Sequence, residues 1–342
     1  KTTTTTTAAA SSSSSTTTSV SQRLFSNQPS RELDYDTSNA GSRKPVRGIY
    51  ESKEYRKPSV GCDLPTPGKT VLDLGAHVGW FTLWCLDHGA SKIIAVEASP
   101  KSYRYHLGNF KNDDRVTSIH AAAVSEEIYQ NSNGGTLNYV IAPNSNNWRN
   151  CVKEQAYWKN SSSLTSITVP CLSVQRLLAE HPGIHTVKID IEGSEMGVLE
   201  SVEWPVSVQY IVFEYSIGTR SCKQDCTGSV GTGCALTCAK VRYPGIQDNL
   251  EAQGFEVNVP GGQESFNTYV TGERVVGPYD KIIFCRRIGG GRFGELAKLA
   301  NLARKAREAR EAREAREVHI QQNSSAVQGT QCVPGTYIAG SV

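Results

Sequence analysis

The sequence predicts an α/β fold with a doubly wound, mostly parallel sheet that carries helices on both faces. Short apolar segments alternate with segments of helical periodicity from about residue 45 to about residue 290. Two of the apolar segments, 71–74 and 185–189, bring acidic residues to a turn that contains glycine. Ligands bind in open α/β sheets where strands end and helices begin. These two strand ends are therefore expected to form the two halves of one site.

The first half of the predicted sheet comes from strands that end where the apolar pattern breaks. Gly75 follows the first strand, and apolar residues from Trp80 to Leu86 then recur with helical spacing. Pro100 stands where a second helix can begin. The polar stretch 125–150, rich in Asn and Gly, is expected to be a long loop or a hairpin insertion. The strands expected in this half are 71–74, 92–96 and 116–124.

The second half of the predicted sheet delivers acidic residues to its edge. The strand 185–189 ends at Asp190, and the strand 208–213 ends at Glu214. Alternation of strands and helices again indicates a parallel arrangement. The elements expected in this half are strands at 167–172, 185–189, 208–213, 255–259 and 281–285, with helices at 174–180 and 194–202.

Composition divides the chain into three regions. Residues 1–44 form a leader rich in Ser and Thr that is expected not to fold. It suits an organelle transit peptide, the stem of a luminal enzyme or a disordered tail, so the compartment stays open. Residues 45–290 form one large domain with a Cys-rich insertion at 217–240. Residues 291–342 form a charged helix and a flexible tail, because the Ala-Arg-Glu repeat drifts against the helical period and keeps no apolar stripe.

The charge balance gives no reason to expect nucleic acid as a partner. The chain has 36 Lys and Arg against 33 Asp and Glu, for a formal net charge of +3, and no basic block. No run of about 18 apolar residues is present, so we expect no membrane span within this chain. The oligomeric state is not indicated.

Four of the ten cysteines cluster in the insertion, separated by three, seven and three residues. Two disulfides, a zinc site and free thiols all remain open, because structural zinc sites more often use C-x-x-C. No other metal-binding pattern of cysteines is present, and Cys85 and Cys285 lie in apolar segments that suit buried thiols. The clustered residues are Cys222, Cys226, Cys234 and Cys238.

The turn after the first strand has the chemistry of a cofactor-binding turn. Gly75 and Gly79 let a ligand approach bare backbone, and the helix that follows points N–H groups at polar ligand atoms. Glu97, 24 positions after Asp73, ends the second strand, where a carboxylate can accept hydrogen bonds from both ribose hydroxyls. A nicotinamide dehydrogenase would use the same geometry, but its usual G-x-G-x-x-G is absent here.

Two motifs together resemble a known family. Asp73, the Gly75-x-x-x-Gly79 spacing and Glu97 resemble the class I S-adenosylmethionine-dependent methyltransferases. The stretch Lys-Ile-Asp-Ile-Glu-Gly at 188–193 narrows the resemblance to the FkbM type, which carries D-x-G-A-N-x-G early and K-x-D-x-E-G late. The resemblance covers about residues 71–216 and implies a Rossmann-like fold with S-adenosyl-L-methionine as cofactor.

The resemblance also implies where that cofactor lies. It assigns Glu97 to the ribose and places Asp73 and Gly75 beside the methionine part. His77 stands where the family usually has Asn, so its hydrogen bonding is left open, and a loop-orienting role is favoured over that of a general base. The cofactor residues it implies are Asp73, Gly75, Ala76, His77, Gly79, Glu97, Ala122 and Ala123.

Methyl transfer to a hydroxyl is an in-line displacement that usually needs a base. Asp190 is the leading candidate, because it ends a central strand that faces the cofactor. Lys188 points to the same side of an extended strand and could keep that carboxylate charged. Glu192 could bind substrate hydroxyls or brace the turn. Capping and salt bridges at a strand–helix junction would explain the same acidic residues without catalysis.

A metal-dependent variant of this mechanism stays open. Asp190, Glu192 and Glu214 could coordinate Mg²⁺ with the substrate oxygens, although no spacing in the sequence demands it. The favoured hypothesis is O-methylation of a hydroxyl on a sugar, a glycan or a secondary metabolite. The alternative is a catalytically idle relative that uses the fold as a binding module.

Overall fold

The structure is a computed structural model that describes ten stretches of the chain. The predicted Cys-rich insertion at 217–240 and the predicted charged tail at 291–342 lie outside the described residues, as does most of the leader. The described stretches are 28–36, 44–52, 54–57, 62–64, 67–141, 151–152, 165–192, 194–216, 245–258 and 280–288. Within these stretches, no helix combines the length and the apolar character needed to span a bilayer.

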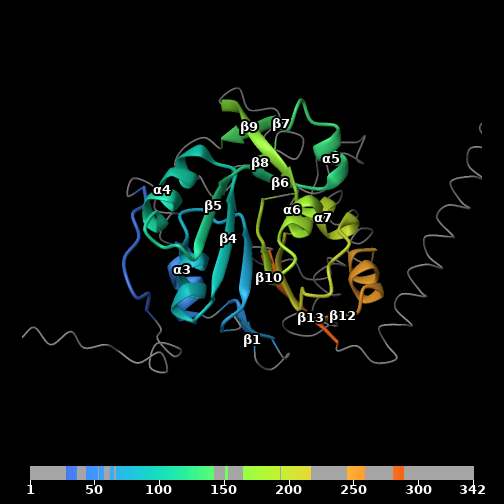
Figure 1. Cartoon of the computed structure of the whole chain (residues 1–342), viewed down its shortest axis with the longest axis horizontal. Helices are drawn as coiled ribbons and strands as arrows, with labels where there is room; N and C mark the ends of the chain where they lie inside the picture. The colour runs from blue at the N-terminus through green and yellow to red at the C-terminus, as the bar shows by residue number, and fades with distance from the viewer. Residues whose placement is uncertain are drawn as a thin grey trace, which may run out of the picture.

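A seven-stranded sheet forms the centre of the molecule (Figure 1). Its strands are β3 (Thr70–Leu74), β4 (Lys92–Glu97), β5 (Val116–His120), β10 (Ile184–Ile189), β11 (Tyr210–Ser216), β12 (Phe255–Asn258) and β13 (Asp280–Arg287). Five of them, in the spatial order β11, β10, β3, β4 and β5, are parallel. β13 and then β12 extend the β11 edge in antiparallel orientation. The predicted doubly wound, mostly parallel sheet is confirmed.

Helices cover both faces of this sheet (Figure 1). Successive side chains of β3 point to opposite faces, so Val71 joins one core cluster and Leu72 joins the other. Trp80 of α3 packs in the cluster with Val71, whereas Val198 of α7 packs in the cluster with Leu72. The helices are α3 (Trp80–Asp87), α4 (Pro100–Phe110), α6 (Val174–Glu180) and α7 (Glu195–Ser201), with a further helix at residues 245–252.

A second, four-stranded sheet stands beyond the end of β5 (Figure 1). The prediction of one strand over 116–124 is wrong, because the chain leaves the central sheet at Ala121. Within 125–150 the strand that ends at Ile141 pairs antiparallel with residues 151–152, as expected of a hairpin insertion, and a short helix that was not expected precedes it. Apolar periodicity does not mark the point at which a chain changes sheets, since both halves have strand character. In spatial order the strands are β6 (Ala122–Val124), β9 (Thr165–Ser173), β7 (Thr136–Ile141) and β8 (Cys151–Val152), and the helix is α5 (Glu126–Gln130).

The segments before β3 pack on the α3 and α4 side of the domain. Residues 28–36 were expected to belong to an unfolded leader, and that expectation is wrong for this stretch. Leu33 is buried, and the backbone N–H groups of Ser30 and Asp34 donate to side chains of α3 and α4. The remaining elements here are α2 (Lys44–Val46), the π-helical turn η2 (Arg47–Glu51), and the antiparallel strands β1 (Arg56–Lys57) and β2 (Cys62–Asp63).

Arg287 ties the antiparallel edge of the sheet to the loop before β11. Its guanidinium lies 4.2 Å from the centre of the Phe255 ring. The same group donates hydrogen bonds to four backbone carbonyls: those of Trp204, Pro205, Val208 and Gln253. A planar guanidinium has five donors in a fixed arrangement, whereas a lysine ammonium has three and an apolar side chain has none. The preceding residue, Arg286, makes one half-exposed ion pair with Glu256.

We predict that Arg287→Met lowers the free energy of unfolding by about 3 kcal/mol, because it removes several charge-assisted hydrogen bonds. Arg286→Met is the matched control and should cost under about 1 kcal/mol, since an exposed ion pair contributes little. Urea unfolding followed by circular dichroism measures both. Equal losses at the two positions would show that the carbonyl contacts of Arg287 do not stabilise this edge.

Candidate active site

The parallel strands place their terminal residues in two rows at the carboxyl edge of the sheet. Asp73 of β3 pairs in register with Lys188 on one side and with Ala95 on the other. Residues two positions further along each strand lie about 6.6 Å closer to the edge. The lower row contains Asp73, Ala95, Lys188 and Val212. The upper row contains Gly75, Glu97, Asp190 and Glu214.

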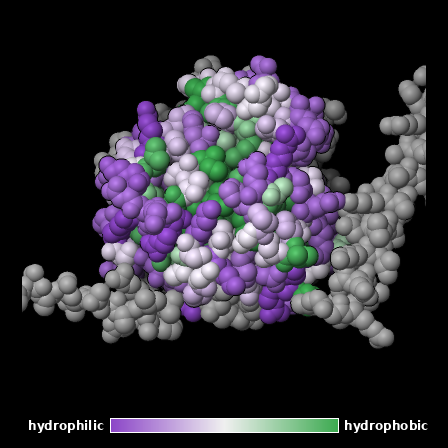
Figure 2. Space-filling view, viewed as in Figure 1, coloured by the Kyte–Doolittle hydropathy of each residue, from purple (hydrophilic) through white to green (hydrophobic). Residues whose placement is uncertain are grey.

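A cavity of about 400 Å³ is lined by the whole upper row. From the lower row Lys188 reaches the cavity, whereas the fully buried Asp73 does not line it. Residues of β6, β7 and β8 form one wall, and the segment from Pro45 to Tyr55 forms another. Hydrophobic residues gather near the middle of the face seen in the space-filling view, with hydrophilic residues around them (Figure 2). The site is therefore an apolar hollow with carboxylates at the strand ends.

The turn after β3 requires glycine at its first position. Gly75 has a positive φ of 80°, and a Cβ there would come within 1.7 Å of the Asp190 carbonyl oxygen. The N–H groups of Gly75 and Ala76 both donate to the Val96 carbonyl. Their backbone therefore lies directly against both neighbouring strands, β4 and β10. A larger residue would force these two halves of the site apart.

Glu97 braces the same turn from the end of β4. One carboxylate oxygen accepts the backbone N–H of His77 at 2.8 Å, and the other accepts that of Ser99 at 2.8 Å. Burial raises the pKa of Glu97 to about 7, although these two hydrogen bonds oppose the shift. Glu97 lines the cavity, and its carboxylate has lone pairs beyond those that these two N–H groups use.

His77 has a positive φ of 53°, a backbone conformation that residues other than glycine rarely adopt. Its backbone N–H bond to Glu97 stabilises this turn. Burial lowers the pKa of His77 to about 4, so the imidazole is neutral near pH 7. His77 lines the cavity, and its neutral ring can donate or accept a hydrogen bond there.

Lys188 links the two motifs. Its ammonium donates to the carbonyl oxygens of Gly75 at 2.8 Å and Leu74 at 3.3 Å. It also forms ion pairs with Asp73 at 3.4 Å and Asp190 at 3.5 Å. Burial alone would lower the pKa of Lys188, but the two carboxylates outweigh it and raise that pKa to about 12. The ammonium thus remains charged and holds Asp190 beside the Gly75 turn.

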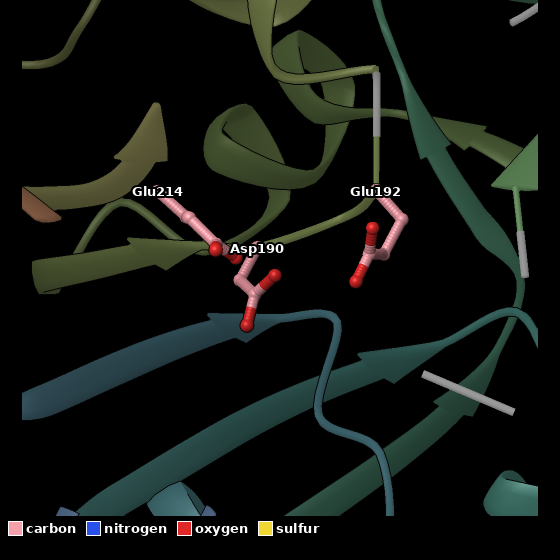
Figure 3. A group of neighbouring side chains, drawn as sticks. All are labelled: Asp190, Glu192 and Glu214. Carbon is pink, nitrogen blue, oxygen red and sulfur yellow. The ribbon is translucent and has the colours of Figure 1, made fainter. Parts of the chain in front are cut away.

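Three carboxylates meet in the cavity near the carboxyl ends of β10 and β11. Asp190, Glu192 and Glu214 each offer an oxygen, and these atoms all lie within 4.8 Å of one another. Figure 3 shows Glu214 reaching toward Asp190 from the end of β11, with Glu192 projecting from the turn after β10. Glu192 has a positive φ of 56°. The arrangement can accept protons, bind hydroxyls or hold a divalent cation.

The structure brings most of the predicted site residues together. Two implied cofactor residues do not line the cavity. Asp73 contacts Lys188 and Thr82 within the core, so it reaches the site only through Lys188. Gly79 packs beneath the turn, where a Cβ would come within 2.2 Å of the Phe110 ring. The residues that do line it are Gly75, Ala76, His77, Glu97, Ala122, Ala123, Lys188, Asp190, Glu192 and Glu214.

Two parts of the predicted site lie outside the described residues. These are Gly193, the last residue of the second motif, and the four clustered cysteines. Other cavity residues were missed by the sequence reasoning. Trp80 and Phe81 were recognised only as helix residues, although their position just after the glycine turn brings them to the cavity. Tyr139 of β7 and Tyr55, just before β1, also line the cavity. No sequence pattern indicated a site role for them, because their segments are far from both motifs.

Comparison with known proteins gives a family match and many distant structural likenesses, including the following two. The family model described as the methyltransferase FkbM domain matches residues 73–256. Precorrin-6y C5,15-methyltransferase from Geobacter metallireducens is 13% identical, with a TM-score of 0.36 over 78% of this chain and 99% of that chain. Fibrillarin from Aeropyrum pernix, solved with bound S-adenosyl-L-methionine, is 13% identical, with a TM-score of 0.31 over 65% of this chain and 69% of that chain.

A search of curated protein sequences gives no match. The family match spans more than half of the chain and includes Asp73, Glu97 and the Lys188–Glu192 stretch. The parallel sheet, the glycine turn and the buried acid at the end of β4 agree with it. This chain belongs to the FkbM methyltransferase domain family and is a class I S-adenosylmethionine-dependent methyltransferase.

Proposed function

We propose that this enzyme methylates a hydroxyl oxygen of a sugar, a glycan or a secondary metabolite. The observation that supports this most directly is the position of Asp190. Its carboxylate lies at the level of Gly75 and Glu97 in the upper row, beside the predicted cofactor turn, and is 3.5 Å from the Lys188 ammonium. A carboxylate held in this way can take a proton from a neighbouring alcohol.

Features of the cavity fit S-adenosylmethionine. The bare backbone of Gly75 leaves room for a ligand against the turn, and the apolar Ala122 and Ala123 offer a surface for the adenine. Glu97 is buried, and hydroxyl donors of the ribose would partly repay the cost of ionising it there. When bound, the cofactor supplies an electrophilic methyl group.

The protein's own part in the reaction is to align the acceptor and remove its proton. Asp190 accepts the hydroxyl proton as the acceptor oxygen takes the methyl group, and the carboxylate becomes a carboxylic acid. Lys188 holds Asp190 in place through the ion pair. Glu192 and Glu214 can accept hydrogen bonds from other hydroxyls of the acceptor. The aromatic side chains of Tyr55 and Tyr139 offer flat apolar walls for its carbon skeleton.

A divalent metal ion is the second candidate mechanism. It is favoured by the approach of the Asp190, Glu192 and Glu214 oxygens to within 4.8 Å of one another. Mg²⁺ prefers oxygen ligands, and these three carboxylates would hold it. There it would supply charge stabilisation to an acceptor oxygen. The direct base mechanism needs no such ion, so chelation distinguishes the two.

The first prediction concerns cofactor affinity. Glu97→Ala removes the proposed ribose acceptor and should weaken S-adenosylmethionine binding about 10- to 100-fold, the usual worth of hydrogen bonds to a charged group. Isothermal titration calorimetry measures the affinity, with the exposed Glu180→Ala as a control for lost charge. An unchanged affinity in Glu97→Ala would place the ribose elsewhere.

The second prediction concerns pH. Folding raises the pKa of Glu97 from its ordinary 4.5 to about 7. The folded protein therefore holds this proton more tightly than the unfolded chain, and the resulting stability is present below about pH 4.5 and lost as the pH rises through 7. Without cofactor, the wild type should lose about 3 kcal/mol relative to Glu97→Ala between pH 4.5 and 8. Urea unfolding across this range tests it, and a constant difference contradicts it.

The third prediction separates the base from the metal mechanism. Asp190→Asn should lower the rate of S-adenosylhomocysteine release about 10²- to 10⁴-fold with an accepted hydroxyl substrate, while cofactor affinity changes little. Chelators should leave the wild-type rate unchanged. Loss of activity with a chelator, restored by Mg²⁺, would instead support the metal mechanism. Full activity in Asp190→Asn would contradict both.

A further inference from the structure

A line of buried hydrogen bonds runs from α4 to the ammonium of Lys188. The Thr82 hydroxyl donates to one oxygen of Asp73 at 2.8 Å, and the other oxygen of Asp73 faces Lys188. The Nε2 atom of His106 lies 3.2 Å from the Thr82 oxygen, and its Nδ1 atom lies 2.9 Å from the Ser118 oxygen. Asp73, Thr82 and His106 are all buried.

The protons of this line can be assigned from its ends. Burial raises the pKa of Asp73, but the Lys188 ammonium and the Thr82 hydroxyl both stabilise its charged form, so we assign Asp73 as a carboxylate that only accepts hydrogen bonds. Thr82 gives its single hydroxyl proton to Asp73, and Nε2 of His106 must therefore be the donor to Thr82. Nδ1 then accepts the Ser118 proton. Burial lowers the pKa of His106 to about 3, so the ring carries one proton.

His106 also contacts the cofactor turn from below. A Cβ on Gly79 would lie 3.1 Å from the His106 ring and 2.2 Å from that of Phe110. The two rings are themselves 4.8 Å apart. Thus α4 packs directly against Gly79, the second glycine of the turn. It reaches Gly75, the first glycine, through Thr82, Asp73 and Lys188. The Lys188 ammonium donates to the Gly75 carbonyl at 2.8 Å.

We propose that Thr82 and His106 are positioning residues for methyl transfer. Through Asp73 they hold Lys188 where it fixes both the Gly75 carbonyl and the Asp190 carboxylate. Neither residue touches the cavity, so neither is catalytic. The proposal rests on the cofactor lying at the Gly75 turn, as the proposed function states. Removing the Thr82 hydroxyl would leave Asp73 without one of its hydrogen bonds. Asp73 is an ion-pair partner of Lys188, so its position affects that of the ammonium.

The test uses Thr82→Val, which keeps the shape of threonine but removes the hydroxyl. It should weaken S-adenosylmethionine binding about tenfold by calorimetry, in line with one hydrogen bond to a charged group. Thr82→Ser restores the donor and should bind within about twofold of the wild type. Thr186→Val is the matched control, because Thr186 is equally buried on β10 but contacts His185 rather than this line. It should bind as the wild type does.

The protonation of His106 is a second measurable property, and measuring it requires no methyl-acceptor substrate. Its ring in the wild type should be a neutral Nε2–H tautomer by nitrogen NMR, with the signal assigned by its loss in His106→Gln. His106→Gln keeps an amide donor toward Thr82 and should retain more cofactor affinity than His106→Leu.

The outcomes separate this proposal from the proposed function. A wild type that fails to bind S-adenosylmethionine contradicts the cofactor site itself, and the NMR tautomer then still tests the proton assignment. A wild type that binds, with Thr82→Val equally tight, overturns the positioning role. So does Thr82→Ser as weak as Thr82→Val, equal weakening in Thr186→Val, or an Nδ1–H tautomer. Should Thr82→Val not fold, the comparison of His106→Gln with His106→Leu decides.

Discussion

One buried ammonium group joins the two halves of this active site. Lys188 lies within 3.5 Å of the carboxylates of Asp73 and Asp190 and donates to the Gly75 carbonyl. Removing such a charge from water costs several kcal/mol unless close ion-pair and hydrogen-bond partners offset this desolvation free energy. The partners of Lys188 belong to both motifs, so β3 and β10 must keep their register for the charge to be tolerated. The Gly75 turn and the proposed base, Asp190, therefore cannot shift independently.

The backbone reinforces this coupling. Gly75 lies so close to the Asp190 carbonyl that no side chain fits between them. His77 and Glu192, one in each turn, both adopt positive φ, which costs about 1–3 kcal/mol for a residue other than glycine. Glu97 offsets part of that cost at His77 by accepting its backbone N–H. The two strained residues lie in the two turns that line the cavity.

Most of the fold was predictable because its central strands are short apolar runs that end at or near a glycine or an acid. β3, β4, β10 and β11 appear within a few residues of their predicted bounds. The errors have a different physical origin. The change of sheets at Ala121 depends on which strand β6 meets, and β9 lies more than 40 residues away. Residues 28–36 fold because Leu33 finds a place on the domain, and composition alone does not reveal that surface.

The same reasoning explains which site residues were placed correctly. Asp73 and Glu97 look alike in the sequence, since each is an acid at the end of an apolar strand. The register sets them apart: Asp73 pairs with Ala95, so Glu97 stands two residues nearer the edge. That step carries Glu97 into the cavity and leaves Asp73 in the core. A buried acid there requires a cation, and Lys188, paired with Asp73 in register, supplies it. Once the register is known, the Lys-x-Asp pattern has a physical reason, because the lysine neutralises the lower row and holds the aspartate of the upper row at the edge where ligands bind.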